Sequence, residues 1–395
     1  MENQKEYEKR YQAIRLYKKG HRFNKILQLV QRSRGWLYKW LSRPARIGTG
    51  GEELETHQTR RSAFSGIGAE VIHWELDQRK IRNIPSIATI ARILFRYGKT
   101  GNKQGQKKNG KKQPYPYFKA EKIGALHQTD LVGPRYLRGT DKVIRFYTFH
   151  TVDVAGRTVW ASQFTDKQSI SLCKHLLETW RNIGIPDVSQ MDNEMAATGG
   201  GRYPYSISQV VRLHLLLGIH MVFIPQGEPG RNATVESFND LWQERVLKRH
   251  TCPSLARLRK VNERFLWYYQ YKKPHRGLTQ KDHGTRFPGI LRDSLWESLR
   301  HMPIGFSLEP YMDGQGWLNI PIAKGKVSFI RKVDAHGKVE INGVQYFIRK
   351  KLEGQYIVAT IFTQRKKLVV KHENKTIKAF SFPIKGHIID PLTVR

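Results

Sequence analysis

The stretch Gly230-Arg231-Asn232-Ala233-Thr234-Val235-Glu236-Ser237-Phe238-Asn239 decides the fold and begins directly after Pro229. Downstream, apolar residues recur at the spacing of one buried helix face: Val235, Phe238, Trp242 and Val246. This periodicity predicts a helix over residues 232–249, with Asn232 as its N-cap residue. Glu236 then lies one turn into the helix, at the flank of the buried stripe, where its side chain is able to face the end of a sheet.

Two aspartates upstream occupy predicted strands. Asp130 lies in His127-Gln128-Thr129-Asp130-Leu131-Val132, inside a strand predicted over residues 123–132, and Asp192 ends a strand predicted over residues 188–192. A carboxylate in an apolar strand is costly unless it is paired or bound to a cation. Strand ends are the places where open α/β sheets present their ligands.

Together, Asp130, Asp192 and Glu236 predict a site made of oxygen ligands. Such a site suits Mg²⁺ or Mn²⁺, which prefer carboxylates and water to nitrogen or sulfur. Two such ions are able to activate an attacking oxygen and stabilise the leaving oxygen in a phosphoryl displacement. Taken singly, each residue also has a structural explanation: Asp130 as the partner of a buried arginine, Asp192 as a helix cap, and Glu236 as a surface residue.

Three ordered motifs carry a resemblance to a known family: Gln128-Thr129-Asp130, Met191-Asp192-Asn193 and Gly230 to Asn239. This set resembles the DDE transposases of bacterial insertion sequences, which are relatives of retroviral integrases. Lys273-Pro274-His275-Arg276-Gly277-Leu278 is similar to the family's segment after the catalytic helix. The resemblance covers the chain end to end.

The resemblance implies that Asp130, Asp192 and Glu236 are catalytic and bind Mg²⁺ or Mn²⁺, as two ions. It makes Asn193, Asn232 and His275 supporting residues. Simpler alternatives stay open: Asn193 as a turn residue, Asn232 as a helix cap, and His275 as a packed histidine rather than a DNA contact or a brace of the glutamate helix. Asp153, on the neighbouring strand, is expected to be structural.

Several positions depart from the family pattern. The gap from Asp192 to Glu236 is 44 positions, which is longer than in many relatives, and the extra length fits a loop at residues 199–205 that we expect to contact DNA or a partner. Ala233 stands where glycine is common, Ser237 where arginine is common, and Gln270 where asparagine is usual. None of these changes removes a carboxylate.

The charge balance points to a nucleic-acid partner. The 395 residues carry 69 Lys and Arg against 33 Asp and Glu, a formal net charge of +36. Phosphates attract such an excess, and binding releases condensed counterions; the alternative is a solvated basic surface. The two cysteines, Cys173 and Cys252, are too few for a disulfide framework or a zinc site and are expected in the core. With no apolar leader or span, the chain is expected to be cytoplasmic and nucleoid-associated, with no membrane contact.

The N-terminal third predicts DNA-binding helices. Residues 1–46 are typical of a helix-turn-helix domain whose third helix carries Arg34 and Lys39. Residues 60–98 predict two more helices, which form either a second helix-turn-helix or a dimerisation hairpin. Residues 99–122 predict a basic linker, either a tether along a phosphate backbone or a solvated spacer. Its candidate DNA-binding residues are Lys107, Lys108, Lys111 and Lys112.

The rest of the chain predicts two further domains. Residues 123–300 have the order of strands and helices of an RNase H-like α/β catalytic core. Residues 317–395 alternate as short strands, with an Asn342-Gly343 hairpin turn, and predict a small C-terminal β-barrel. The expected fold class is therefore multidomain: all-α helix-turn-helix units, an RNase H-like core and a β-barrel.

The expected function is that of a recombinase acting on double-stranded DNA, both element ends and target. Hydrolysis would leave a 3′-hydroxyl, and that hydroxyl would attack target DNA by transesterification. The resemblance implies a homo-multimer in the synaptic complex. The alternatives are a recruited DNA-binding regulator that keeps the fold without activity, and a nuclease that cuts without joining.

Overall fold

The computed structural model describes residues 12–13, 16, 23–33, 68–97, 114–140, 142–193 and 204–394. The chain divides into two compact units, residues 1–104 and 105–395. Each unit is described by itself. The six predicted DNA-binding residues lie outside the described residues: Arg34, Lys39, Lys107, Lys108, Lys111 and Lys112. So does most of the predicted loop at residues 199–205.

The N-terminal unit contains three described helices: α2 (Phe23–Val30), α5 (Ala69–Gln78) and α6 (Ile87–Arg96). On α2, Ile26 and Val30 are buried against Ala13. Helix α6 starts at the predicted Pro85-Ser86 entry, where the Ser86 hydroxyl accepts a hydrogen bond from the Thr89 amide as an N-cap. The contact between α5 and α6 fits both a second helix-turn-helix and a dimerisation hairpin, so that alternative stays open.

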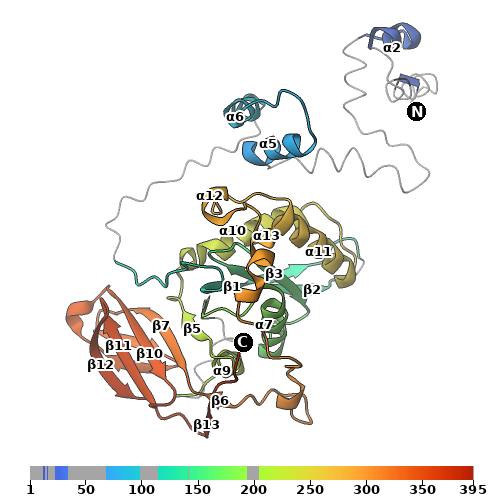
Figure 1. Cartoon of the computed structure of the whole chain (residues 1–395). Helices are drawn as coiled ribbons and strands as arrows, with labels where there is room; N and C mark the ends of the chain where they lie inside the picture. The colour runs from blue at the N-terminus through green and yellow to red at the C-terminus, as the bar shows by residue number, and fades with distance from the viewer. Residues whose placement is uncertain are drawn as a thin grey trace. The chain divides into compact units, whose positions relative to one another are not determined.

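The second unit is built on a mixed sheet (Figure 1). Strands β1 (Leu126–Tyr136), β2 (Arg145–Asp153) and β3 (Val159–Phe164) form an antiparallel meander. Strand β4 (Val188–Met191) lies parallel to β1, and β5 (His220–Phe223) lies parallel to β4. The predicted RNase H-like order of strands and helices is present.

Helices cover both faces of this sheet. Helices α7 (Ser169–Ile183) and α9 (Gln209–Leu216) contribute to one apolar cluster, which contains Cys173. Helices α10 (Ala233–Trp242) and α11 (Leu255–Tyr271) contribute to a second cluster, which contains Cys252. Both cysteines are therefore core residues, as predicted. The shorter elements are α12 (Gln280–His283), α13 (Pro288–Ser294), the 3₁₀ segments Pro229–Asn232, Trp296–Ser298, Glu309–Tyr311 and Lys350–Leu352, and the π-helical turn Gln243–Leu247.

The C-terminal strands extend the core sheet. Strand β7 (Lys326–Lys332) pairs in parallel with β5, and β10 (Tyr356–Phe362), β11 (Lys367–His372) and β12 (Lys375–Ser381) follow it in order to the sheet edge. Apolar side chains of these strands belong to the same cluster as α7 and α9. The structure therefore contains the predicted C-terminal strands as part of a mixed sheet, and a separate small β-barrel is not confirmed.

Two smaller strand pairs complete the unit. Strands β8 (Lys338–Ile341) and β9 (Val344–Phe347) form the predicted hairpin, with positive φ at both Asn342 and Gly343 in the turn between them. Strands β6 (Ile322–Ala323) and β13 (Ile388–Ile389) pair in parallel. Within the described residues, no helix combines the length and the apolar character that crossing a membrane requires.

Candidate active site

The sheet places the two aspartates at matching positions of adjacent parallel strands: Asp130 lies within β1, and Asp192 directly follows the end of β4. Gln128 on β1 lies opposite Gln190 on β4, so Asp130 and Asp192 each follow two residues later. Glu236 lies in the first turn of α10. The Asp130 carboxylate interacts electrostatically with the other two. Burial first, and then repulsion from Asp192 and Glu236, together raise its pKa to about 6, against hydrogen bonds from Leu131 and Asn239 that lower it.

Glu236 is affected in the same direction. Its pKa is raised by partial burial and then by Asp240, one turn further along α10. Among the described residues, however, no three His, Cys, Asp or Glu side chains are grouped closely enough to hold a metal ion. The structure therefore places the three carboxylates within electrostatic reach of one another without assembling them into a ligand set.

The donor set nevertheless fits a divalent cation. It consists of carboxylate oxygens, the ligands that Mg²⁺ and Mn²⁺ prefer. Burial and, after it, repulsion from Asp192 and Glu236 raise the pKa of Asp130, and a bound cation would offset both by compensating the negative charge. Within the described part of the chain, neither Asp130 nor Glu236 forms an ion pair that would already compensate its charge.

Asn239 connects Asp130 to a buried histidine. Its side-chain amide donates to Asp130 Oδ2 at 2.6 Å, and its Oδ1 accepts from His150 Nδ1 at 2.6 Å. His150 lies directly opposite Asp130 on β2, and burial lowers its pKa to about 4, so the ring is neutral at neutral pH. Asn239 is therefore held as a donor towards Asp130. The sequence marked Asn239 only as part of a motif, and it gave no signal for His150.

Two glutamines hold the start of α10. Gln128 Oε1 accepts from the Thr234 and Val235 amides at 3.1 and 3.4 Å, which satisfies free N–H groups of the first turn. Gln190 Nε2 donates to the Arg231 carbonyl at 3.0 Å and to Asn232 Oδ1 at 2.9 Å. The residues two places before Asp130 and Asp192 therefore fix the segment that leads into Glu236.

Asn232 occupies the N-cap position but does not cap the helix with its side chain. Instead its amide donates to the Thr129 carbonyl at 3.4 Å, next to Asp130, while its oxygen accepts from Gln190. The prediction that Asn232 caps the helix was therefore wrong in its mechanism, because Gln128 supplies the cap from a neighbouring strand. The buried Asn232 side chain links β1, β4 and α10.

Asn193 connects the turn after β4 to two other strands. Its amide donates to the Ile224 carbonyl at 2.5 Å, and its oxygen accepts from Arg331 Nη2 at 2.6 Å. Burial lowers the pKa of Arg331 to about 10, which leaves the guanidinium charged at neutral pH. Arg331, on β7, thus braces the residue that follows Asp192. Sequence reasoning missed it because it is one of many basic residues in the C-terminal strands.

His275 is 7% exposed and lies in the segment that follows α11. Its ring packs against Tyr269 with centroids 4.4 Å apart, and Tyr269 in turn packs against Phe238 of α10. Burial lowers the pKa of His275 to about 3, so it is neutral. Asp153, expected to be structural, is fully buried and accepts from the Gly124 and Gly156 amides beside His127.

Arg231 joins three parts of the unit in a cluster that we call the Arg231 cluster: Arg231, Glu228, Tyr115, Tyr117 and Tyr356. The guanidinium carbon lies 3.9 Å from the centre of the Tyr115 ring, and the guanidinium donates to Glu228, Tyr117 and Tyr356. The Tyr356 hydroxyl also donates to Glu228. The cluster ties the segment before β1 and strand β10 to the loop that leads into α10.

Replacing Arg231 is expected to loosen this junction. Arg231→Ala removes a charge-assisted hydrogen bond and a cation–π contact, so the free energy of unfolding should fall by about 2–3 kcal/mol. Arg231→Lys keeps the charge but not the forked donors, so its free energy of unfolding should lie between those of the wild type and Arg231→Ala. Urea unfolding of the full chain measures this. Arg181→Ala is the control, since exposed Arg181 has one hydrogen bond, to the Phe306 carbonyl; equal losses for both alanine variants would contradict the role given to the cluster.

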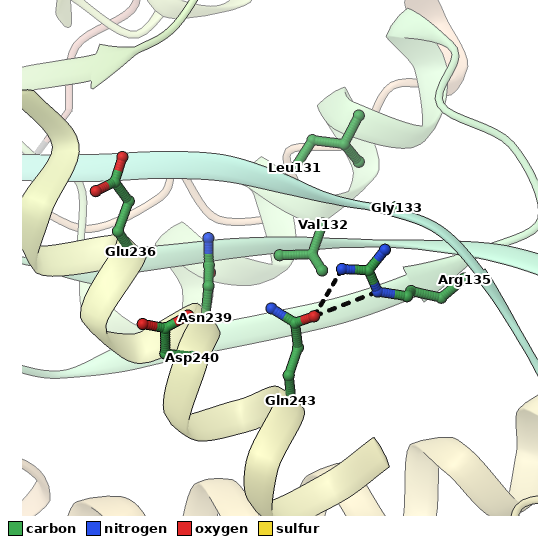
Figure 2. Close-up of a pocket in the computed structure, with 8 residues that line it drawn as sticks. All are labelled: Leu131, Val132, Gly133, Arg135, Glu236, Asn239, Asp240 and Gln243. Atoms are coloured by element: carbon green, nitrogen blue, oxygen red, sulfur yellow. Dashed lines mark hydrogen bonds between the residues drawn. The ribbon is translucent and has the colours of Figure 1, made fainter. Parts of the chain in front are cut away.

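A groove opens beside these carboxylates between β1 and α10 (Figure 2). Its volume is about 490 Å³. Eight residues line it: Leu131, Val132, Gly133, Arg135, Glu236, Asn239, Asp240 and Gln243. Glu236 and Asn239 thus belong both to the carboxylate site and to the groove. The groove is open and polar, which suits an extended polar chain better than a buried small molecule.

Comparisons with known proteins agree with this arrangement. Residues 217–281 match the family model described as an integrase core domain, and residues 5–51 match one described as a homeodomain-like domain. The first match contains Glu236 and His275. The second overlaps the predicted helix-turn-helix over residues 1–46. A comparison with curated proteins gave no match.

Several solved structures are similar to this chain. The HTLV-2 integrase catalytic core domain in complex with magnesium is 17% identical, with 43% of this chain and 99% of that chain covered, at a TM-score of 0.33. The simian T-cell lymphotropic virus intasome in complex with PP2A regulatory subunit B56 gamma is 14% identical, with 82% and 96% covered, at 0.36. The BIV integrase catalytic core is 14% identical, with 44% and 97% covered, at 0.32. By the two family models, this chain carries an integrase core segment and an N-terminal homeodomain-like segment, a combination consistent with the DDE transposases that its motifs resemble.

Proposed function

We propose that the protein is a DNA transposase or integrase of the DDE type, which cleaves the 3′ ends of a mobile element and transfers them to target DNA. An integrase core domain implies an enzyme of the polynucleotidyl transferase type. The observation that carries the proposal is the convergence of Asp130, Asp192 and Glu236 from β1, the end of β4 and the first turn of α10.

Asp130, Asp192 and Glu236 would hold Mg²⁺ or Mn²⁺, as a pair of ions. When bound, such ions supply Lewis acidity for the attacking and leaving oxygens of a phosphodiester. Asn239 would keep the Asp130 carboxylate oriented, since its side-chain amide donates to Oδ2. Gln128 and Gln190 would keep the start of α10, and with it Glu236, fixed against the two strands. Magnesium in the HTLV-2 integrase structures supports a divalent ion.

The proposed partners are element ends and target DNA. The homeodomain-like segment at residues 5–51 supports recognition of duplex DNA, and the net charge of +36 supports a large phosphate contact. The integrase of the simian virus forms an intasome, which supports a multimer here. Residues 60–98 and the basic linker at residues 99–122 are proposed to take part in DNA recognition and tethering.

One alternative has an observation in its favour. A regulator that binds DNA without cutting it would not need an assembled metal site, and among the described residues no such cluster is present. The alternative predicts that carboxylate variants keep full function. It also predicts no reaction products under any metal condition.

The deciding experiment incubates the full chain with Mg²⁺ or Mn²⁺ and labelled duplex carrying the DNA that flanks its own gene. The wild-type protein should yield cleaved and strand-joined products, and Glu236→Gln should yield neither. The expected loss is at least about 10³-fold, because a metal ligand that stabilises transition-state charge contributes several kcal/mol. Both proteins should bind the duplex equally. Tight binding without products from the wild type would favour the regulator.

A further inference from the structure

We infer that Arg135 binds a backbone phosphate of the DNA strand that enters the active site along the groove between β1 and α10. The inference deepens the proposed function and rests on it. Arg135 was not singled out by its sequence context. The case for it comes from the groove lining, from an irregularity in β1 and from the partner that holds the guanidinium.

Charge is distributed unevenly along the groove (Figure 2). Glu236 lines one end, and Arg135 lies at the other end beside Gln243. Arg135 is the single basic side chain among the eight lining residues. A polyanion that places one phosphate at the carboxylates and their cations therefore meets a positive charge further along the same surface.

An irregularity in β1 places Arg135 on this face. Asp130 pairs with His150 and Val132 with Thr148, but Arg135 rather than Pro134 pairs with Phe146. One extra residue in β1 shifts the alternation, so Arg135 points to the same side of the sheet as Asp130. In a regular strand its side chain would point to the opposite face. Bulges beside active sites commonly re-aim a side chain in this way.

Gln243 holds the guanidinium in place without neutralising it. Gln243 Oε1 accepts from Arg135 Nη2 at 2.7 Å and from Nε at 3.3 Å, and the Pro134 carbonyl accepts from Nη1 at 3.2 Å. The partners are neutral oxygens, although Glu236 and Asp240 line the same groove. A guanidinium carries five N–H donors, so donors remain for a phosphate, and its orientation is already set.

The spacing suits a strand of DNA. Gln243 follows Glu236 by seven residues, almost two turns, so the two side chains share one helix face about 10 Å apart. With a rise of about 3.4 Å per nucleotide, that distance covers roughly three steps of one strand. Arg135 would therefore contact a phosphate a few nucleotides from the reacting bond.

A purely structural role predicts something different. An exposed hydrogen bond between Arg135 and Gln243 would contribute only to stability, and its loss would leave DNA contacts unchanged. A phosphate contact instead makes Arg135 and one particular phosphate interdependent. Removing the charge of that phosphate should matter in the wild type and should not matter once Arg135 is gone.

The test uses full-length protein and a fluorescein-labelled duplex carrying the DNA that flanks its own gene. Single phosphates near the cleavage site are replaced one at a time by neutral methylphosphonates. In the wild type, the methylphosphonate at one particular linkage should weaken binding and slow cleavage about tenfold. Arg135→Gln should show that loss with unmodified DNA and lose nothing more at that linkage. Lys174→Gln, which removes an exposed charge from α7 on the other face, should behave as the wild type.

A second variant moves the charge across the groove. Adding Gln243→Lys to Arg135→Gln should restore at least part of the lost affinity and the sensitivity to the same linkage, because the cation returns to the groove from α10. The inference would be overturned if the losses in binding from Arg135→Gln and from the methylphosphonate simply added at every linkage. It would also be overturned if the double variant bound DNA no more tightly than Arg135→Gln. Wild-type protein that binds but never cleaves would refute the proposed function, while the binding scan would still decide the role of Arg135.

Discussion

Asp130→Asn is expected to abolish DNA cleavage and, without divalent metal, to make the protein more stable. Cleavage should fall by at least about 10³-fold, because the variant loses a metal ligand whose charge no neighbour replaces. Stability should rise because the wild-type carboxylate is partly buried near Asp192 and Glu236. Asparagine keeps an oxygen for the Asn239 amide and removes the charge. Active sites commonly trade stability for function in this way.

The pH dependence of the free energy of unfolding shows whether the Asp130 charge destabilises the folded protein. The pKa of Asp130 is raised from its ordinary value of 3.8 to about 6 in the folded protein, so the folded state binds more protons between these pH values. The free energy of unfolding of the wild type should therefore fall as pH rises from about 4 to 6. Above pH 6 the cost should be about 2–3 kcal/mol, and Asp130→Asn should recover it. Urea unfolding in EDTA at pH 4.5 and pH 7.5 measures the difference.

Metal and a matched substitution complete the test. Mg²⁺ should stabilise the wild type by an amount that rises with the logarithm of its concentration above Kd, and it should leave Asp130→Asn unchanged. Asp153→Asn is the control, because that carboxylate accepts hydrogen bonds from two backbone amides beside His127. The NH₂ group of an asparagine there would face one of these N–H donors without an acceptor between them. This substitution should destabilise the protein at both pH values. A lower stability of Asp130→Asn in EDTA would show that the Asp130 charge is compensated within the protein.

Local patterns in the sequence predicted much of the core. The apolar spacing on α10 and the alternation on β10 are properties of each segment, so they gave the right elements. The motif glutamate was correctly placed one turn into its helix because the Pro229-Gly230 turn and the stripe through Trp242 both mark the start. Local pattern also placed Asp130 inside a strand and Asp192 at the end of another.

Features that depend on distant partners had no such signal. Pairing of β7 with β5 joins residues about a hundred positions apart, and nothing in the alternating C-terminal strands distinguishes a separate barrel from an extended sheet. Capping of α10 by Gln128 likewise reverses the local expectation from Asn232. The extra residue that turns Arg135 towards α10 becomes visible only from the register between β1 and β2.

The same substitution at two glutamines is expected to have very different consequences. Gln190→Glu should reduce cleavage by about a hundredfold or more, whereas Gln128→Glu should reduce it by less than about tenfold. Gln190 acts as a donor, to the Arg231 carbonyl and to Asn232 Oδ1, and a carboxylate there would oppose two oxygens without a proton between them. A buried group left unsatisfied costs about 1–3 kcal/mol, and more if it is charged.

Gln128 acts mainly as an acceptor, for the Thr234 and Val235 amides, and a carboxylate can accept both hydrogen bonds. The first turn of a helix also favours a negative charge. Its weak donation to the Arg231 carbonyl, at 3.5 Å, is the only contact in the described structure that Gln128→Glu would remove. The segment leading into α10 should therefore stay in place.

The loss in Gln190→Glu arises through Glu236, since a displacement of about 1 Å in a catalytic group is enough to cost a hundredfold in rate. Single-turnover cleavage with saturating protein measures this step separately from DNA binding, which both variants should keep. Gln190→Met removes the donor without adding an opposing charge and should lie between the two glutamate variants. Equal losses for Gln190→Glu and Gln128→Glu would mean that net charge near Asp130, and not the hydrogen bonds at the start of α10, controls the reaction.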